Sequence, residues 1–147
     1  MLAELDPDQE LPDPIYLASL DHAVTPEEIA FRDLLVFHRD CLNGGLDQAM
    51  FNRENTDQTI APVIEAHRSV GLFAIASLLD EASDLWRQEG DLDEVTDQYV
   101  RFTYGENNDQ PDAVERAAVR YAQLHEAAFT SVIEAAKRGD FKTFDFG

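Results

Sequence analysis

The sequence has few of the features that mark several large classes of protein. Its single cysteine, Cys41, excludes an internal disulfide and is expected to be a small buried apolar side chain. No uninterrupted apolar run approaches the roughly 18 residues of a membrane-spanning helix. The first residues lack the basic and apolar regions of a signal peptide. These absences favour a cytoplasmic protein.

Basic residues are also scarce, and the resulting negative charge is unevenly distributed. Thirty Asp and Glu residues stand against eleven Lys and Arg, which gives a formal net charge of −19 at pH 7. Residues 1–30 carry eight acids and no Lys or Arg, and residues 80–115 carry twelve acids against two bases. Such a charge distribution repels nucleic acid and anionic lipid and attracts basic proteins. We therefore expect no direct binding to nucleic acid or to a membrane.

Patterns typical of catalytic, metal or cofactor sites are absent from the sequence. None of the four histidines has a metal-ligand spacing from another: they are His22, His38, His67 and His125. No serine lies in a nucleophile-elbow context, and no glycine-rich loop precedes a helix in the form that binds phosphate. We expect a protein without catalytic activity, metal ion or cofactor.

Apolar residues make up 44% of the chain, enough for a core, and they recur at helical spacing. Thr25 and Glu28 flank Pro26 in a pattern typical of a helix start with a capping box. Asn43-Gly44-Gly45 predicts the end of that helix, and Gly71 predicts a joint between two later helices. Asp91 and Glu94 predict the start of a further helix, whose expected buried face is Leu92, Val95, Tyr99 and Phe102.

The last helix is expected to be long and continuous, from about Pro111 to Arg138. No segment shows the alternation typical of a strand. We predict an all-α fold, a single-domain bundle of about six helices over residues 25–147 with a long C-terminal helix. An acidic, proline-containing arm with a short helix is predicted to precede it over residues 1–24.

The acids of residues 80–115 have a spacing that suits a charge mimic of DNA. On a helix, side chains three or four residues apart lie about 5–6 Å apart at Cβ. That distance is comparable to the charge spacing of about 3.4 Å along one DNA strand. The pairs Asp80/Asp84 and Asp93/Asp97 have this spacing. We predict that the twelve acids of this segment bind a partner: Asp80, Glu81, Asp84, Glu89, Asp91, Asp93, Glu94, Asp97, Glu106, Asp109, Asp112 and Glu115.

Residues 42–52, LNGGLDQAMFN, resemble the NGGF-x-Q-Y-F-x-N signature of the DMP family of DNA-mimic proteins. The residues that match the signature are Gly44, Gly45, Gln48 and Asn52. Three residues stand where the family prefers aromatics: Leu46, Ala49 and Met50. We interpret the signature as structural, with its glycines turning the chain and its Gln and Asn satisfying backbone groups at helix ends. The likeness continues through residues 66–71 and 76–82.

The resemblance implies a helical fold and no known catalysis. In at least one branch of the family it implies binding to a helix-turn-helix transcription regulator in place of DNA, as a homodimer. Three functions are consistent with the sequence. The first is a non-enzymatic DNA mimic that occupies the DNA-binding surface of a basic partner. The second is an immunity or adaptor protein that binds one basic toxin or enzyme. The third is an acidic globular protein, such as a salt-adapted one, with no charge-specific partner.

Overall fold

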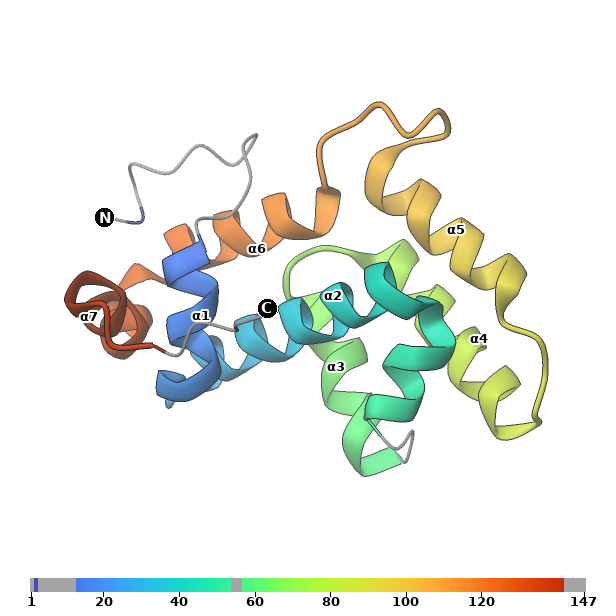
Figure 1. The fold of residues 1–147 in the computed structure, drawn as a ribbon, viewed down its shortest axis with the longest axis horizontal. Coiled ribbons are helices and arrows are strands. Elements are labelled where there is room, and N and C mark those ends of the chain that lie inside the picture. The colour runs from blue at the N-terminus through green and yellow to red at the C-terminus, as the bar shows by residue number, and fades with distance from the viewer. Residues whose placement is uncertain (1, 3–12, 54–56, 142–147) are drawn as a thin grey trace, which may run out of the picture.

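The computed structural model describes residues 2, 13–53 and 57–141, and within them the chain forms seven α-helices and no strand (Figure 1). The prediction of an all-α fold is therefore confirmed. None of the helices in these ranges combines the length and the apolar character needed to cross a membrane. Residues 3–12 of the predicted arm and the last six residues of the chain lie outside the described part.

One end of the molecule is formed by α1 (Asp13–His22) and α7 (Thr130–Arg138), which pack against each other (Figure 1). The short helix predicted within residues 1–24 is present as α1. Its side chains Ile15 and Ala18 are buried in the common core. The described part of this segment therefore packs into the same core as the other helices.

The longest element, α2 (Pro26–Asn52), runs from this end to the other. It begins with the predicted capping box: the Glu28 N–H donates to Thr25 Oγ1, and the Thr25 N–H donates to Glu28 Oε1, both at 3.1 Å. Gly45 interrupts the helix with φ 79° and ψ 179°. Because only glycine adopts this conformation without strain, the chain turns here as predicted, and α2 consists of two helical pieces.

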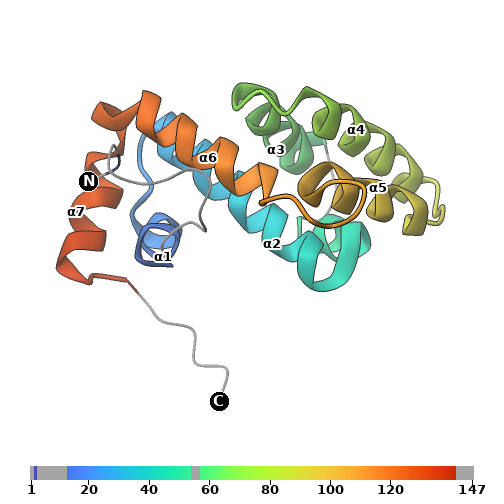
Figure 2. The ribbon, with the colours of Figure 1, turned by 90° about the horizontal axis from the view of Figure 1, so that it is seen from above.

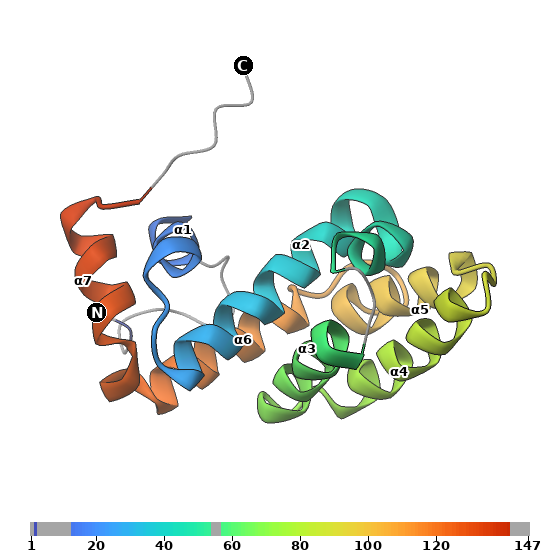
Figure 3. The ribbon, with the colours of Figure 1, turned by 90° about the horizontal axis from the view of Figure 1, so that it is seen from below.

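The opposite end is formed by α3 (Asp57–Ser69), α4 (Phe73–Arg87) and α5 (Asp93–Tyr104), all of which contact α2 (Figures 2 and 3). The joint between α3 and α4 lies at Gly71, whose φ of 84° matches the prediction. On α5 the expected core positions are buried except for Phe102, which is 46% exposed. That assignment was wrong because the buried stripe continues through Thr103 instead, four residues after Tyr99.

The prediction of one continuous helix over residues 111–138 was also wrong. The chain forms α6 (Ala113–Leu124), then a 3-10 helix, η2 (Glu126–Phe129), and then α7 in a new direction (Figure 1). The break depends on tertiary contacts. The Phe129 ring packs edge-on against Phe31 at 5.3 Å between centroids, and the Val132 N–H at the start of α7 donates to Glu28 Oε2 at 2.9 Å. No glycine or proline marks this break in the sequence.

A candidate protein-binding face on α4 and α5

The outer side of α4 carries the first group of exposed acids. Ile75, Leu79 and Ala82 form its buried side, and this fixes the opposite side toward solvent. Asp80, Glu81 and Asp84 all lie on that exposed side. Their spacing of three and four residues places them within one turn of each other.

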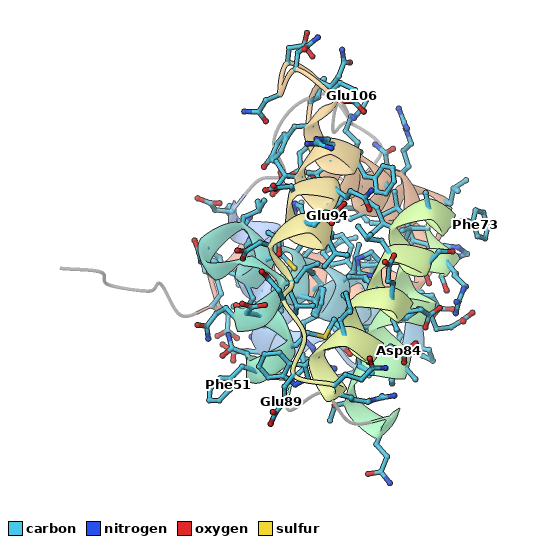
Figure 4. All side chains as sticks on the ribbon, turned by 90° about the vertical axis from the view of Figure 1, so that its right-hand side faces the viewer. Phe51, Phe73, Asp84, Glu89, Glu94 and Glu106 are labelled. Carbon is cyan, nitrogen blue, oxygen red and sulfur yellow. The ribbon has the colours of Figure 1, made fainter. Side chains whose placement is uncertain are left out.

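The turn between α4 and α5 presents two more acids. Glu89 adopts a left-handed conformation with φ 57°, and the Gly90 N–H donates to Leu85 O at 2.7 Å. A Cβ atom on Gly90 would lie only 3.2 Å from Leu85 O and from Leu85 Cδ2, so the close approach favours glycine. Glu89, rather than Gly90, has the left-handed conformation in this turn, and its side chain is exposed to solvent (Figure 4).

The acids of α5 continue the same face. Asp93, Glu94 and Asp97 are exposed, and Glu94 lies in the middle of the face in Figure 4. The predicted capping pair at the start of α5 does not form as expected. Asp91 Oδ1 accepts from the Asp93 N–H at 2.8 Å, and α5 begins at Asp93.

The loop between α5 and α6 carries Glu106 and Asp109, both exposed. Gly105 ends α5 with φ 87°, and the Gln110 N–H donates to Tyr104 O at 2.8 Å. Backbone hydrogen bonds therefore shape this loop, and Glu106 stands at the end of the face opposite Glu89 (Figure 4).

Two of the twelve predicted acids, Asp112 and Glu115, are directed into the fold. Asp112 caps α6: its Oδ1 accepts from the N–H groups of Val114 and Glu115 at 2.9 and 3.0 Å. Its Oδ2 contacts His38 Nε2 at 2.7 Å. Glu115 Oε1 lies 3.5 Å from Arg39 Nη2. The other ten of the twelve acids are exposed, whereas these two make contacts within the fold.

A buried polar network lies beneath this region and connects three helices. His38 on α2 is fully buried, with Nε2 on Asp112 and Nδ1 2.5 Å from the Tyr99 hydroxyl of α5. The same hydroxyl interacts with the thiol of Cys41, which is buried as predicted. Since burial raises the pKa of both Cys41 and Tyr99, both remain uncharged at neutral pH. The network fixes α5 and the start of α6 relative to α2.

Asp112 stays ionised despite its position. Burial by itself raises the pKa of a carboxyl group, but the hydrogen bond and charge of His38 oppose this effect. The Glu115 N–H and the Tyr104 hydroxyl donate further hydrogen bonds to the carboxylate. The pKa of Asp112 is lowered as a result.

A second buried histidine, His67 on α3, forms no hydrogen bond with this network in the described part of the chain. Its Nδ1–H donates to Val63 O at 2.8 Å, and its Nε2 has no hydrogen-bond partner among the described residues. Burial lowers the pKa of His67 to about 4, so it is neutral at pH 7. The sequence contained no signal for either buried histidine beyond its place in an apolar stripe.

The acidic face comprises the ten exposed acids: Asp80, Glu81, Asp84, Glu89, Asp91, Asp93, Glu94, Asp97, Glu106 and Asp109. The same segment carries two bases, Arg87 and Arg101. Arg68 of α3 also contacts Asp80, at 2.9 Å. Such exposed pairs contribute about 0–1 kcal/mol each, and the face keeps a large negative excess. Within the described residues, no three potential metal ligands lie close enough together to bind an ion.

Comparison with protein families matches residues 22–138 to the family described as DMP19-like protein. The chain belongs to the DMP19-like family. The resemblance predicted from residues 42–52 is confirmed, and the match extends over α2 to α7. Comparisons with curated proteins and with solved structures returned no match.

One part of our interpretation of the signature is confirmed in this DMP19-like protein, and another part was wrong. Gly45 forms the turn, and the residues that replace the family's aromatics are fully buried: Leu46, Ala49 and Met50. Gln48 and Asn52, however, do not satisfy the helix ends as we expected. The Gln48 Nε2 donates to Asn52 Oδ1 at 2.7 Å on the exposed surface.

Proposed function

We propose that this DMP19-like protein is a non-enzymatic DNA mimic whose acidic face occupies the DNA-binding surface of a basic protein such as a transcription regulator. The observation that supports the proposal most is that ten exposed acids lie on two adjacent helices and the loops at their ends. Figure 4 shows four of these acids, Asp84, Glu89, Glu94 and Glu106, on one side of the molecule. Family membership supports it independently, because the family is one of DNA mimics.

The spacing of the carboxylates favours this role. Asp80 and Asp84 are one helical turn apart on α4, as are Asp93 and Asp97 on α5. One turn rises about 5.4 Å, so each helix presents a pair of charges at an interval of the same order as the charge spacing of about 3.4 Å along one DNA strand. Because α4 and α5 pack against each other, a partner meets both pairs together. The lysines and arginines that hold phosphates in a DNA groove can pair with these carboxylates.

The packing beneath the face also supports the proposal. The contacts of Tyr99 and Asp112 with His38 hold α5 and its following loop in place before any partner arrives. A preorganised surface loses less conformational entropy on binding than a flexible acidic segment does. In line with the family, we propose that the partner is a helix-turn-helix regulator and that the protein acts in the cytoplasm as a homodimer.

The experiment compares three forms of the protein as baits in extracts of the source cells. The test variant combines Glu81→Gln, Glu94→Gln and Asp97→Asn within the acidic face. The control variant removes the same amount of charge elsewhere through three exposed acids of α1 and α7: Asp13→Asn, Asp21→Asn and Glu134→Gln. Capture is measured at about 0.1 M and about 1 M NaCl, where the Debye length falls from about 10 Å to about 3 Å.

We expect the wild type and the control to capture the same basic DNA-binding protein at low salt. The test variant is expected to capture it at least about tenfold less well. Removing three charge pairs slows the electrostatically steered association and weakens the contacts in the complex. Equal loss in the test and control variants would mean that overall charge, and not the acidic face, governs binding. A captured basic toxin or enzyme without DNA-binding activity would favour the immunity or adaptor function instead.

A further inference from the structure

Two exposed phenylalanines border the acidic face on opposite sides. Phe51, near the end of α2, is 66% exposed, and Phe73, the first residue of α4, is 65% exposed. In the view of Figure 4 the two phenylalanines are labelled on opposite sides of the molecule, and Glu94 is labelled between them.

Neither phenylalanine is needed for the core. The second piece of α2 buries Ala49 and Met50, which leaves Phe51 on the solvent side. The core side of α4 begins at Ile75, two residues after Phe73. Single exposed apolar residues are common, and Leu124 on α6 is another, at 81%. What distinguishes Phe51 and Phe73 is their position on either side of a strongly charged face.

The charge between the two phenylalanines restricts what can cover them. A second copy of this chain would bring two acidic faces together, and like charges in contact cost several kcal/mol. Nucleic acid is repelled for the same reason. A protein surface that combines lysine or arginine with apolar side chains complements both components of the face.

We propose that Phe51 and Phe73 are apolar anchors that select a protein partner whose cationic surface is bordered by apolar side chains. The proposal rests on the proposed function in that it takes the acidic face as a binding surface, and it goes further by specifying the partner. DNA offers no counterpart to the two phenylalanines. The partner's affinity for this protein therefore includes an apolar contribution that salt does not weaken. Its affinity for DNA lacks this contribution.

The test uses two synthetic helical peptides with the same lysines along one face. One carries leucines on both flanks of the lysine row, and the other carries glutamines there. Binding of each labelled peptide to the full-length protein is measured by fluorescence anisotropy at about 0.1 M and about 1 M NaCl. The proteins compared are the wild type, the double variant Phe51→Ser with Phe73→Ser, and the control Leu124→Ser, at the end of α6 away from α4 and α5 (Figure 1).

We expect the wild type and the Leu124→Ser control to bind the leucine peptide at least about tenfold more tightly than the glutamine peptide, and to keep this preference at high salt. The double variant is expected to bind both peptides equally and to have an unchanged unfolding midpoint. Equal binding of the two peptides by the wild type overturns the proposal. If the Glu81→Gln, Glu94→Gln, Asp97→Asn variant then binds both peptides more weakly than the wild type does, the acidic face remains supported as a binding surface.

A second copy of the chain could also cover the two phenylalanines. Analytical sedimentation of the wild type and the double variant tests this alternative. We expect the oligomeric state to be the same in both proteins. A wild-type dimer that dissociates in the double variant would show that the partner copy covers the phenylalanines, and this result also overturns the proposal.

Discussion

His38 and Asp112 are 74 residues apart in the chain, yet the Nε2 atom of the histidine lies 2.7 Å from Oδ2 of the aspartate. The histidine is fully buried on α2, and the aspartate caps α6. This contact uses an acid that the sequence grouped with the partner-binding residues. It also fixes the position of the loop that carries Glu106 and Asp109. Asp112 is not part of the acidic face, but it positions the loop that carries two of the acids of that face.

Removing the Asp112 side chain is expected to destabilise the fold. Asp112→Ala leaves two N–H groups of α6 and the His38 ring without their acceptor. We expect the free energy of unfolding, measured by urea denaturation, to fall by about 2–4 kcal/mol. Asp109→Asn, an exposed change in the same loop, is expected to alter it by no more than about 0.5 kcal/mol. Equal unfolding midpoints for the two variants would contradict the role assigned to Asp112.

Glu28 is expected to be as important as Asp112, because one carboxylate serves two helix starts. Its Oε1 accepts from the N–H of Thr25 at 3.1 Å, and its Oε2 accepts from the N–H of Val132 on α7 at 2.9 Å. Glu28→Ala removes the acceptor of the buried Val132 N–H and of the partly buried Thr25 N–H, and is expected to cost about 2–4 kcal/mol of unfolding free energy.

The adjacent residue provides the control for Glu28. Glu27→Ala, in the same first turn of α2, is expected to cost less than about 1 kcal/mol. In the Glu28→Ala protein, hydrogen exchange at the Val132 amide should accelerate more than exchange at amides in the middle of α6. Unchanged protection of Val132 would argue against this role of Glu28.

The buried His67 predicts how stability changes in acid. Its pKa is lowered from 6.5 to about 4 in the folded protein, so the unfolded chain binds the proton more tightly. The stabilisation from keeping His67 neutral is fully present above pH 6.5 and is lost as the pH falls toward 4. The total effect is on the order of 3 kcal/mol.

This pH effect can be isolated with His67→Leu, which removes the titrating group. We expect the difference in unfolding free energy between wild type and His67→Leu to shift by about 3 kcal/mol in favour of the variant between pH 7 and pH 4. The control His125→Gln changes an exposed residue, and its unfolding free energy should depend on pH as that of the wild type does. Parallel pH profiles for wild type and His67→Leu would show that His67 does not carry the effect.

Local chemistry in the sequence was enough to predict several helix boundaries. The capping box of Thr25 and Glu28 and the turns at Gly45 and Gly71 depend on residues close together in the chain, and the structure confirms all three. The break before α7 could not be predicted in this way. It is stabilised by contacts between Phe129 and Phe31, and between Val132 and Glu28, whose partners lie about a hundred residues away.

The same distinction applies to the candidate site. Helical periodicity placed the acids of α4 and α5 on exposed sides, because each helix buries one continuous apolar stripe. It could not show that Asp112 and Glu115 turn inward, since their partners His38 and Arg39 belong to α2. The position of Phe51 and Phe73 at the edges of the face likewise depends on how α2 packs beside α4 and α5.

The central claim, that the acidic face takes the place of DNA, is tested most directly by competition for one captured partner. The partner is first bound to a labelled DNA duplex that it recognises, and the wild type or the Glu81→Gln, Glu94→Gln, Asp97→Asn variant is then added. We predict that the wild type displaces the duplex completely and that the variant requires at least about tenfold higher concentration. A stable ternary complex of partner, duplex and wild-type protein would contradict the claim.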